Sequence, residues 1–312
     1  MARFVERLKY YFNNPPLPQA SFQLSPHYLS GINVSFKNKK IKHHFISPLG
    51  KPVVQPSFNK KNVINESYLE ERIKEGKEKL HLTEKRIACL IPEACIKVYA
   101  FSFASLPAAR EEMEQIIKWQ VKKQMPHLPD DIRLSYDVIR SNKEQKILVS
   151  LAKASVVQEY EALFSRIGLK VRTIGVATLC LFNLLERKEE DNVMLVNIEE
   201  DYISLVAILN SEISLYRFKP FVIESETRLS FSQKINSIVQ EVENTVNFVK
   251  DRENKGINSF WFRLGMVNQE KGVLSILREK LPYPVKDVET SIKLELTSKE
   301  KGILSPLIGQ IL

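Results

Sequence analysis

The sequence predicts an α/β protein of two similar halves, because one order of elements occurs twice along the chain. Each half opens with three consecutive strand-like runs and then alternates helices with strands. A charged stretch at 186–192, ERKEEDN, divides the halves. The 312 residues, 44% of them apolar, are enough to give each half its own hydrophobic core.

The first 20 residues are expected to lie outside these halves. Residues 1–14 predict a short amphipathic helix, and residues 15–20 predict an extended linker, because proline lacks an amide donor and restricts its neighbour. Such a short helix is marginal alone, so its apolar stripe should dock on protein or, helped by its basic residues, on a membrane surface. The stripe consists of Phe4, Val5, Leu8, Tyr11 and Phe12.

The first half begins at residue 21 with three strand-like runs, FQLS, LSGINVSF and IKHHFISPL, which turn-prone residues separate. A helix over about 68–80 follows, and Ser67 with Glu70 three residues later has the spacing of a capping box. The runs RIACLI and IKVYAFSF then predict two further strands.

Another helix is expected to start at Pro107, and the alternating runs IRLSYDVIR and KILVSLAK after it predict a hairpin. The helix expected over 156–167 has signals at both ends. Ser155 and Gln158 have the spacing of a capping box, and Gly168 suits a left-handed C-terminal cap. Strand VRTIGV and a short apolar helix complete the half.

The second half repeats this order. VMLVNI, YISLVAIL and EISLYRF predict three strands, and a long helix with valine and isoleucine at helical spacing ends near Gly256. Strand SFWFRLG, a helix near 272–280 and strand PVKDV follow. The repetition indicates an internal duplication of an α/β unit.

Three stretches resemble the PilM family of type IV pilus assembly proteins, which has an actin-like fold related to Hsp70 and the sugar kinases. They are FASLPAAREEMEQIIKWQVKKQMPHLPDDIRLSYDVI, LVSLAKASVVQEYEALFSRIGLKVRTIGVATLCLFNLL and the ending LSPLIGQIL. The resemblance implies one actin-like domain over 21–190, with an inserted PilM-type subdomain at about 97–152, and a second domain over 191–312.

The same resemblance implies a function. Members of the family act as cytoplasmic proteins at the inner face of the inner membrane, where they help to organise a type IV pilus or a related secretion or competence machine. The implied partner is the cytoplasmic tail of a PilN-like membrane protein, docked in a groove beside the inserted subdomain, and self-association is a further expectation. The sequence does not identify the residues of that groove.

The nucleotide-binding turns of the family are altered in this chain. The family's first turn has Asp-Ile-Gly followed by a Lys, whereas the matching stretch here runs from Gln23 through Ser25 to Ser30 and lacks all three. The second turn should again have Asp-Ile-Gly, but it begins with Asn197 and places Glu199 where phosphate would lie. A carboxylate a few ångströms from phosphate repels it by about 4 kcal/mol at an effective dielectric of 20.

The third nucleotide-binding element, a Gly-Gly turn, is reduced to Gly265. We therefore expect a pseudo-ATPase without catalytic residues, a cofactor or a metal, whose altered turn residues only cap strand ends. The alternative is a divergent actin-like ATPase with unusual phosphate loops. It would bind ATP and magnesium, with Asp201 in place of a lost carboxylate.

The net charge of +9 would suit a protein that binds nucleic acid or the surface of an anionic membrane. The lysines between Lys37 and Lys85 lack the aromatic residues of a single-strand-binding platform, so a solvated basic face is the simpler interpretation. No nucleic-acid partner is expected, and peripheral contact with a membrane surface stays open. No run approaches the roughly 20 apolar residues that span a bilayer.

Other residue types suggest core positions rather than sites. The three cysteines lack CxxC spacing and lie in apolar patterns, which predicts buried free thiols. His43 and His44 are adjacent in a strand, so they point to opposite faces and cannot chelate zinc together. Trp119 and Trp261 are expected in the core, with an interface role as the alternative.

Overall fold

The computed structural model describes most of the chain. The predicted N-terminal helix over 1–14, with its apolar stripe, lies outside the described residues. No helix among those described is long and apolar enough to cross a membrane. The described ranges are 17–36, 40–107, 109–140, 145–185, 191–221, 230–267, 272–288 and 296–311.

The first half contains a five-stranded sheet in the order β3-β2-β1-β4-β8. Its first three strands pair antiparallel in a meander, and the last two are parallel to β1. The three consecutive strands expected at the start of this half are therefore confirmed. The bounds are β1 Ala20–Leu24, β2 Tyr28–Ser35, β3 Lys40–Pro48, β4 Arg86–Leu90 and β8 Lys170–Gly175.

The second half contains a sheet of the same size and order, β11-β10-β9-β12-β13. Its antiparallel meander and its two added parallel strands match those of the first sheet one for one. The predicted duplication is therefore real at the level of topology. The bounds are β9 Val193–Ile198, β10 Tyr202–Leu209, β11 Glu212–Pro220, β12 Ser259–Leu264 and β13 Val285–Asp287.

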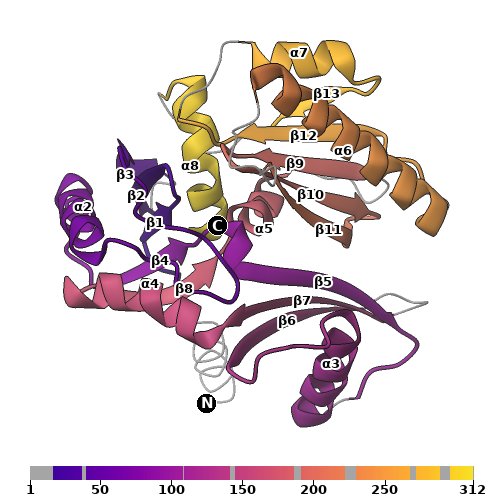
Figure 1. Cartoon of the computed structure of the whole chain (residues 1–312), viewed down its shortest axis with the longest axis horizontal. Coiled ribbons are helices and arrows are strands. Elements are labelled where there is room, and N and C mark those ends of the chain that lie inside the picture. The colour runs from indigo at the N-terminus through magenta and orange to yellow at the C-terminus, as the bar shows by residue number, and fades with distance from the viewer. Residues whose placement is uncertain are drawn as a thin grey trace, which may run out of the picture.

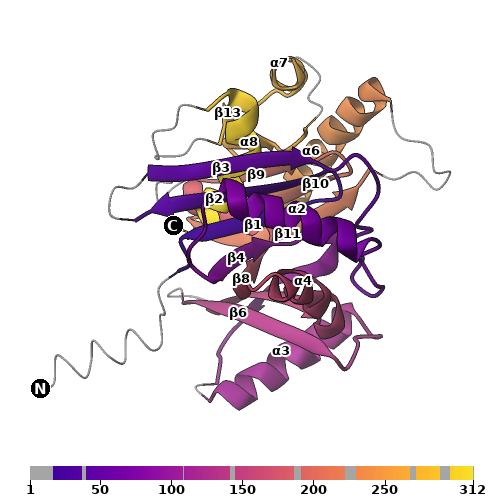
Figure 2. The ribbon, with the colours of Figure 1, turned by 90° about the vertical axis from the view of Figure 1, so that its left-hand side faces the viewer.

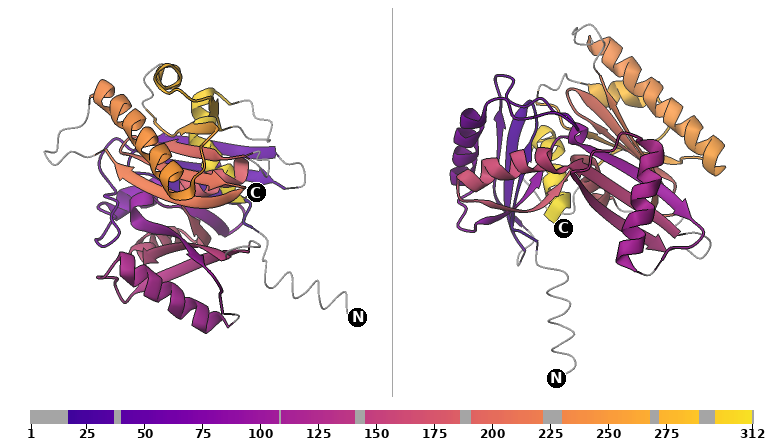
Figure 3. Two further views of the ribbon diagram at one scale, coloured as in Figure 1. Left: turned by 90° about the vertical axis from the view of Figure 1, so that its right-hand side faces the viewer. Right: turned by 60° about the horizontal axis from the view of Figure 1, so that its bottom comes forward.

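The helices follow the same duplication. Helices α2 (Glu66–Lys79) and α4 (Ala154–Arg166) pack on the first sheet (Figure 2). Helices α6 (Phe231–Glu253) and α7 (Val273–Lys280) pack on the second sheet (Figure 3). The remaining helices lie between the sheets (Figure 1), where their apolar side chains form one shared core with both. They are α5 (Ala177–Leu181), the short 3-10 helix η2 (Phe182–Leu184) and α8 (Ser298–Ile311).

An inserted unit interrupts the first half between β4 and α4, within the stretch where the PilM resemblance implies a subdomain. It is an antiparallel sheet in the order β5-β7-β6, with α3 packed on one face (Figure 1). The predicted hairpin is the pair of strands β6 and β7. The short 3-10 helix η1 (Glu93–Cys95) leads into the insertion. Its elements are β5 Ile96–Phe103, α3 Arg110–Gln124, β6 Ile132–Arg140 and β7 Gln145–Lys153.

Three predicted helix starts are wrong. The helix expected to start at Pro107 is α3, which begins at Arg110 with Ala109 as its N-cap. Helix α2 is capped by Asn65, whose side chain accepts from the Tyr68 amide at 3.1 Å, so Ser67 lies inside the helix. Helix α4 begins directly after β7 without a connecting loop, which places Ser155 in the first turn. Its hydroxyl donates to Asp131 at 3.0 Å instead of capping the helix. The start of α4 is set by the end of β7, and the start of α2 is set by the Asn65 cap, so the spacing of a capping box locates neither helix start.

One tryptophan also differs from expectation. Trp119 is 58% exposed on α3, and the Lys123 ammonium lies 3.3 Å from its ring centroid. The buried stripe of α3 repeats every four residues, and Trp119 lies midway between Ile117 and Val121 in sequence and therefore on the opposite side of the helix. Trp261 packs at the edge of the shared core. The cysteines are buried and free, as predicted: Cys89, Cys95 and Cys180.

The shared core requires a close approach of α5 and α8. A Cβ atom on Gly309 would lie 2.1 Å from the carbonyl oxygen of Cys180, which is backbone and cannot rotate away. Directly after α5, the side-chain amide of Asn183 in η2 donates to the Gly309 carbonyl at 2.8 Å and holds this end of α5 against α8. Only glycine permits this contact between the last helices of the two halves.

We expect Gly309→Ala to lower the free energy of unfolding by about 3 kcal/mol, because overpacking here must separate α5 from α8. Urea denaturation measures the loss. Gly256→Ala is the matched control, since a Cβ there meets nothing within 4 Å. Equal stability of the two variants would contradict a close helix contact at Gly309.

Candidate functional site

The ends of β1 and β9, with the turns that follow them, meet between the two sheets, and most of the predicted site residues lie there. Gln23 and Glu199 are both buried, with the Gln23 amide nitrogen 3.4 Å from the Glu199 carboxylate. Asn197 is buried beside them. Ser25 stabilises its own turn by accepting from the His27 amide at 3.3 Å.

One predicted site residue makes no side-chain hydrogen bond to the others. Ser30 lies on β2, opposite Gln23 in the antiparallel pair. Its hydroxyl is buried and has no hydrogen-bond partner among the residues that the structure describes. Nothing in the structure gives Ser30 a role in the site.

The centre of the site is Arg263, which the sequence reading treated as an ordinary strand residue. It comes from β12, its side chain is 1% exposed, and its guanidinium forms an ion pair with the Glu199 carboxylate. Four further oxygens of the chain accept hydrogen bonds from the guanidinium, so each of its three nitrogens has at least one acceptor. They are Asn197 Oδ1 at 2.8 Å, Tyr28 Oη at 3.3 Å, and the carbonyl oxygens of Gly302 at 2.6 Å and Ile303 at 3.3 Å.

Gly265 makes room for this guanidinium. A Cβ atom at Gly265 would lie 2.1 Å from Nη1 and 2.3 Å from Cζ of Arg263. The backbone of Gly265 has no positive φ, so its small size, and not its conformational freedom, is what the site uses. This predicted nucleotide-site position therefore has a packing role in the structure.

A second buried carboxylate extends the network, and the sequence reading missed it. Glu93 in η1 accepts from the amide and hydroxyl of Thr178 at 2.8 and 2.7 Å, and from the Tyr216 hydroxyl. The Thr178 hydroxyl in turn accepts from Asn197 at 2.9 Å and contacts Ser204. A continuous chain of hydrogen bonds thus runs from Glu93 in the first half to the guanidinium in the second.

The environment shifts the pKa values of these groups. Burial raises the pKa of the Glu199 carboxyl, and the positive charge of Arg263 opposes that shift. Burial also raises the pKa of Glu93, against the lowering effect of the Tyr216 and Thr178 hydrogen bonds. Burial and the nearby Glu199 charge raise the pKa of Tyr28 far above its ordinary value, so the phenol stays protonated and donates to Glu199.

At the outer edge of the site, one contact joins the turn after β1 to the turn after β9. His27 Nε2 contacts the carboxylate of Asp201, whose side chain is 47% exposed. Asp201 is the residue considered as a replacement for a lost carboxylate, and here it binds the opposite turn. Among the described residues, no cluster of three or more His, Cys, Asp or Glu is arranged to hold a metal ion.

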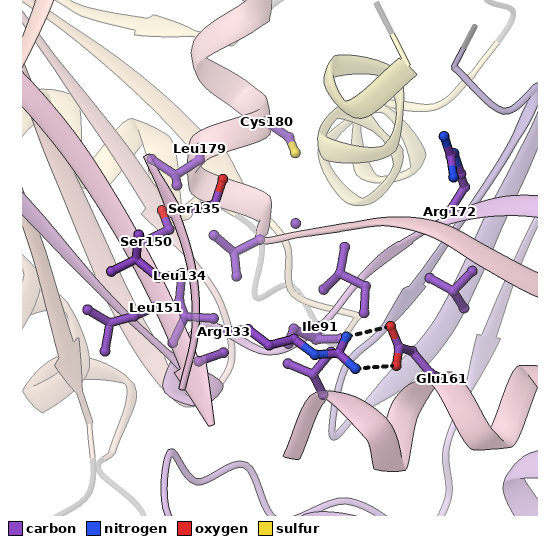
Figure 4. A pocket seen from close by; sticks show the side chains of 17 residues that line it. Ile91, Arg133, Leu134, Ser135, Ser150, Leu151, Glu161, Arg172, Leu179 and Cys180 are labelled. Atoms are coloured by element: carbon purple, nitrogen blue, oxygen red, sulfur yellow. Dashed lines mark hydrogen bonds and ion pairs between the residues drawn. The ribbon is translucent and has the colours of Figure 1, made fainter. Parts of the chain in front are cut away.

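A pocket of about 350 Å³ lies beside the inserted unit, between β6 and β7 on one side and α4, β8 and α5 on the other (Figure 4). Apolar side chains such as Leu134, Val171 and Leu179 line it. At its rim Arg133 and Glu161 form two hydrogen bonds of 2.6 and 2.9 Å. A groove at this place was expected from the PilM resemblance, but its lining comes from five segments and no local pattern marks it.

The repeated five-stranded sheet, with two central helices and the site between the halves, defines an actin-like ATPase fold with an inserted subdomain. Comparison with solved structures agrees. A chain of the PilM-PilN type IV pilus biogenesis complex matches over 95% of this chain and 98% of its own length, with a TM-score of 0.78 and 14% sequence identity.

A second solved structure is more distant. The ethanolamine utilization protein EutJ from Carboxydothermus hydrogenoformans matches over 95% of this chain and 90% of its own, with a TM-score of 0.50 and 12% identity. No model of a protein family matches the sequence, and no curated protein matches it. The likeness therefore lies in the fold, and the predicted fold class is confirmed.

We expect Arg263→Ala to destabilise the protein by about 3 to 5 kcal/mol, because it leaves the Glu199 carboxylate buried without its partner. The double variant Arg263→Met with Glu199→Gln should recover part of this loss, since neither charge then remains. Urea denaturation at neutral pH measures both. Arg278→Ala, which breaks the exposed 2.9 Å pair with Asp287, is the control and should change stability by less than about 1 kcal/mol. An Arg263→Ala variant as stable as this control would disprove a central role for the buried pair.

Proposed function

We propose that this chain is a scaffold of the assembly platform of a type IV pilus, or of a related secretion or competence machine, and that it acts without hydrolysing ATP. Its partner is the cytoplasmic tail of a PilN-like protein of the inner membrane, and its place is the cytoplasmic face of that membrane. The observation that carries the proposal is the match, along nearly the whole length of both chains, to a chain of the PilM-PilN complex.

The pocket beside the inserted unit supports this partner. Its volume of about 350 Å³ is in the range of binding sites for small ligands and short peptide segments, and most of its lining is apolar. A few polar groups at the rim, among them Arg133 and Glu161, supply orientation. This combination suits a short chain segment with apolar side chains.

The buried ion pair supports the absence of ATP hydrolysis. A nucleotide phosphate between the two turns would have to displace the Arg263 guanidinium from Glu199 and from the carbonyl groups of α8. The displaced pair would leave a carboxylate facing phosphate, which is unfavourable. The residues present therefore do not fit a magnesium nucleotide at this position, and we infer a pseudo-ATPase.

The partner proposal is tested with a synthetic peptide of the cytoplasmic tail of a PilN-like inner-membrane protein from the same organism. We expect micromolar binding by fluorescence anisotropy, and at least tenfold weaker binding to Ser150→Trp, because the new side chain fills the pocket. Ser102→Trp is the control, since Ser102 is exposed on the same inserted sheet and does not line the pocket. No binding, or equal loss in both variants, would argue against the proposal.

The pseudo-ATPase proposal is tested by thermal unfolding with millimolar magnesium ATP. A ligand at 100 times its dissociation constant adds about 2.7 kcal/mol, which shifts Tm by at least about 2 °C for a protein of this size. We expect no shift in the native protein. A clear shift, together with phosphate release, would favour the divergent ATPase instead.

A further inference from the structure

A second pocket lies at the opposite end of β1 from the Arg263 site. It has a volume of about 220 Å³ and lies where the chain leaves α2, against the start of β1, the end of β2 and the first residues of β3. The Arg263 site lies at the other end of β1, so the two sites are separate. The polar residues that line this second pocket include Asn33, Lys42, His43, His81, Thr83 and Glu84.

Most of these polar groups are hydrogen-bond donors that the chain leaves unused. The rings of His43 and His81 lie side by side with their centroids 4.5 Å apart, and neither ring has a hydrogen-bond partner among the described residues. Lys42 is exposed, and no ion pair joins it to a described residue. Even a neutral imidazole carries one N–H, and the ammonium group and the Thr83 hydroxyl add further donors. Such a set of donors suits an anion with several oxygen atoms.

A β-bulge brings Lys42 beside His43. Adjacent residues of a regular strand point to opposite faces of the sheet. In the pairing of β2 with β3, Asn33 lies opposite His43. The next residue of β2, Val34, lies opposite Ile41, so Lys42 is the extra residue of a bulge. A bulge re-aims the side chain of its extra residue, and here both neighbours line the pocket.

His81 occupies a backbone position that usually takes glycine. It follows α2 with a left-handed φ of 49°. Its amide donates to the Glu78 carbonyl at 2.9 Å, and the next amide, of Leu82, donates to the Lys77 carbonyl at 3.2 Å. This is a Schellman cap, and α4 ends with Gly168, at φ 78°, in the same place. A side chain here costs stability, so the cap alone does not explain the histidine, whereas a ligand at its ring does.

The surroundings of the pocket favour an anion over a metal ion. Glu84 is the only carboxylate among the described residues that line it. Four basic residues are exposed at this end of the first sheet, and no ion pair joins any of them to a described residue. They are Lys40, Lys85, Arg86 and Lys170. Their combined positive charge attracts an anion and repels a metal cation.

We propose that this pocket binds a phosphate monoester, whose phosphate oxygens are held by Lys42, His43 and His81. The inference goes beyond the proposed function and does not depend on it, because neither the Arg263 site nor the pocket beside the inserted unit takes part. Two sources share this chemistry, namely the headgroup of an anionic lipid and a small soluble phosphate ester.

The experiment follows the imidazole signals of the whole protein by NMR during titration with glycerol 3-phosphate. The chain has five histidines, and we expect only the signals of His43 and His81 to shift, while those of His27, His44 and His127 stay in place. Sedimentation with vesicles of phosphatidylcholine and phosphatidic acid distinguishes the two sources. Binding to the vesicles alone assigns the phosphate to a lipid, and binding of the soluble ester as well assigns it to a small molecule.

His81→Gly separates binding from folding. It should weaken phosphate binding at least tenfold and yet raise Tm by about 2 °C, because glycine adopts the left-handed conformation without strain. His44→Ala is the control and should leave binding unchanged, since His44 follows His43 on β3 and does not line the pocket. Glu84→Gln should strengthen binding about threefold, because it removes the carboxylate that opposes the anion.

Three results would overturn the proposal. One is the absence of any shift of the His43 and His81 signals with inorganic phosphate, glycerol 3-phosphate or the vesicles. Another is a shift of both signals with zinc but with no phosphate compound, which would make the pocket a metal site. The third is equal weakening of phosphate binding in His81→Gly and His44→Ala, which would indicate a general effect of surface charge.

Discussion

The buried ion pair between Glu199 and Arg263 is the constraint on which the centre of this molecule depends. Neither charge would be tolerated there alone, since desolvation of one unpaired ion costs several kcal/mol. The guanidinium also satisfies carbonyl groups of α8 and contacts Tyr28 of the first half, so one side chain joins both sheets and a central helix. Gly265 and the turn after β9 are arranged around it.

At the boundary between the halves, the shared apolar core surrounds the network of hydrogen bonds and strengthens it. α5 and α8 bury their side chains against both sheets, which removes water from the region where Glu93 and Glu199 lie. In this dry environment each hydrogen bond of the network is stronger, and each unpaired group would be more expensive. The duplicated halves therefore share one interior, with a polar chain crossing an otherwise apolar core.

The strands, the hairpin and the duplication could be predicted because they follow from local periodicity. The sequence also drew attention to the turns after β1 and β9, yet it presented Glu199 only as a charge that would repel phosphate or as a residue that caps a strand end. Its partner Arg263 lies 64 residues away, and only the parallel pairing of β9 with β12 brings them together. A signal did exist: an arginine inside the apolar run SFWFRL needs a buried carboxylate, and Glu199 follows a fully buried strand.

The way the inserted unit joins the first half has a consequence for protein engineering. Ile96 at the start of β5 lies opposite Ala152 at the end of β7, so the two connections leave and re-enter the body as antiparallel neighbours about 5 Å apart. The chain therefore leaves and re-enters the body at a single junction, so a replacement unit would be joined at only these two neighbouring points. Such a replacement would also have to match the contacts of the unit with the body, because Lys146 of β7 pairs with Glu212 of β11 at 3.5 Å and Leu148 packs against the shared core.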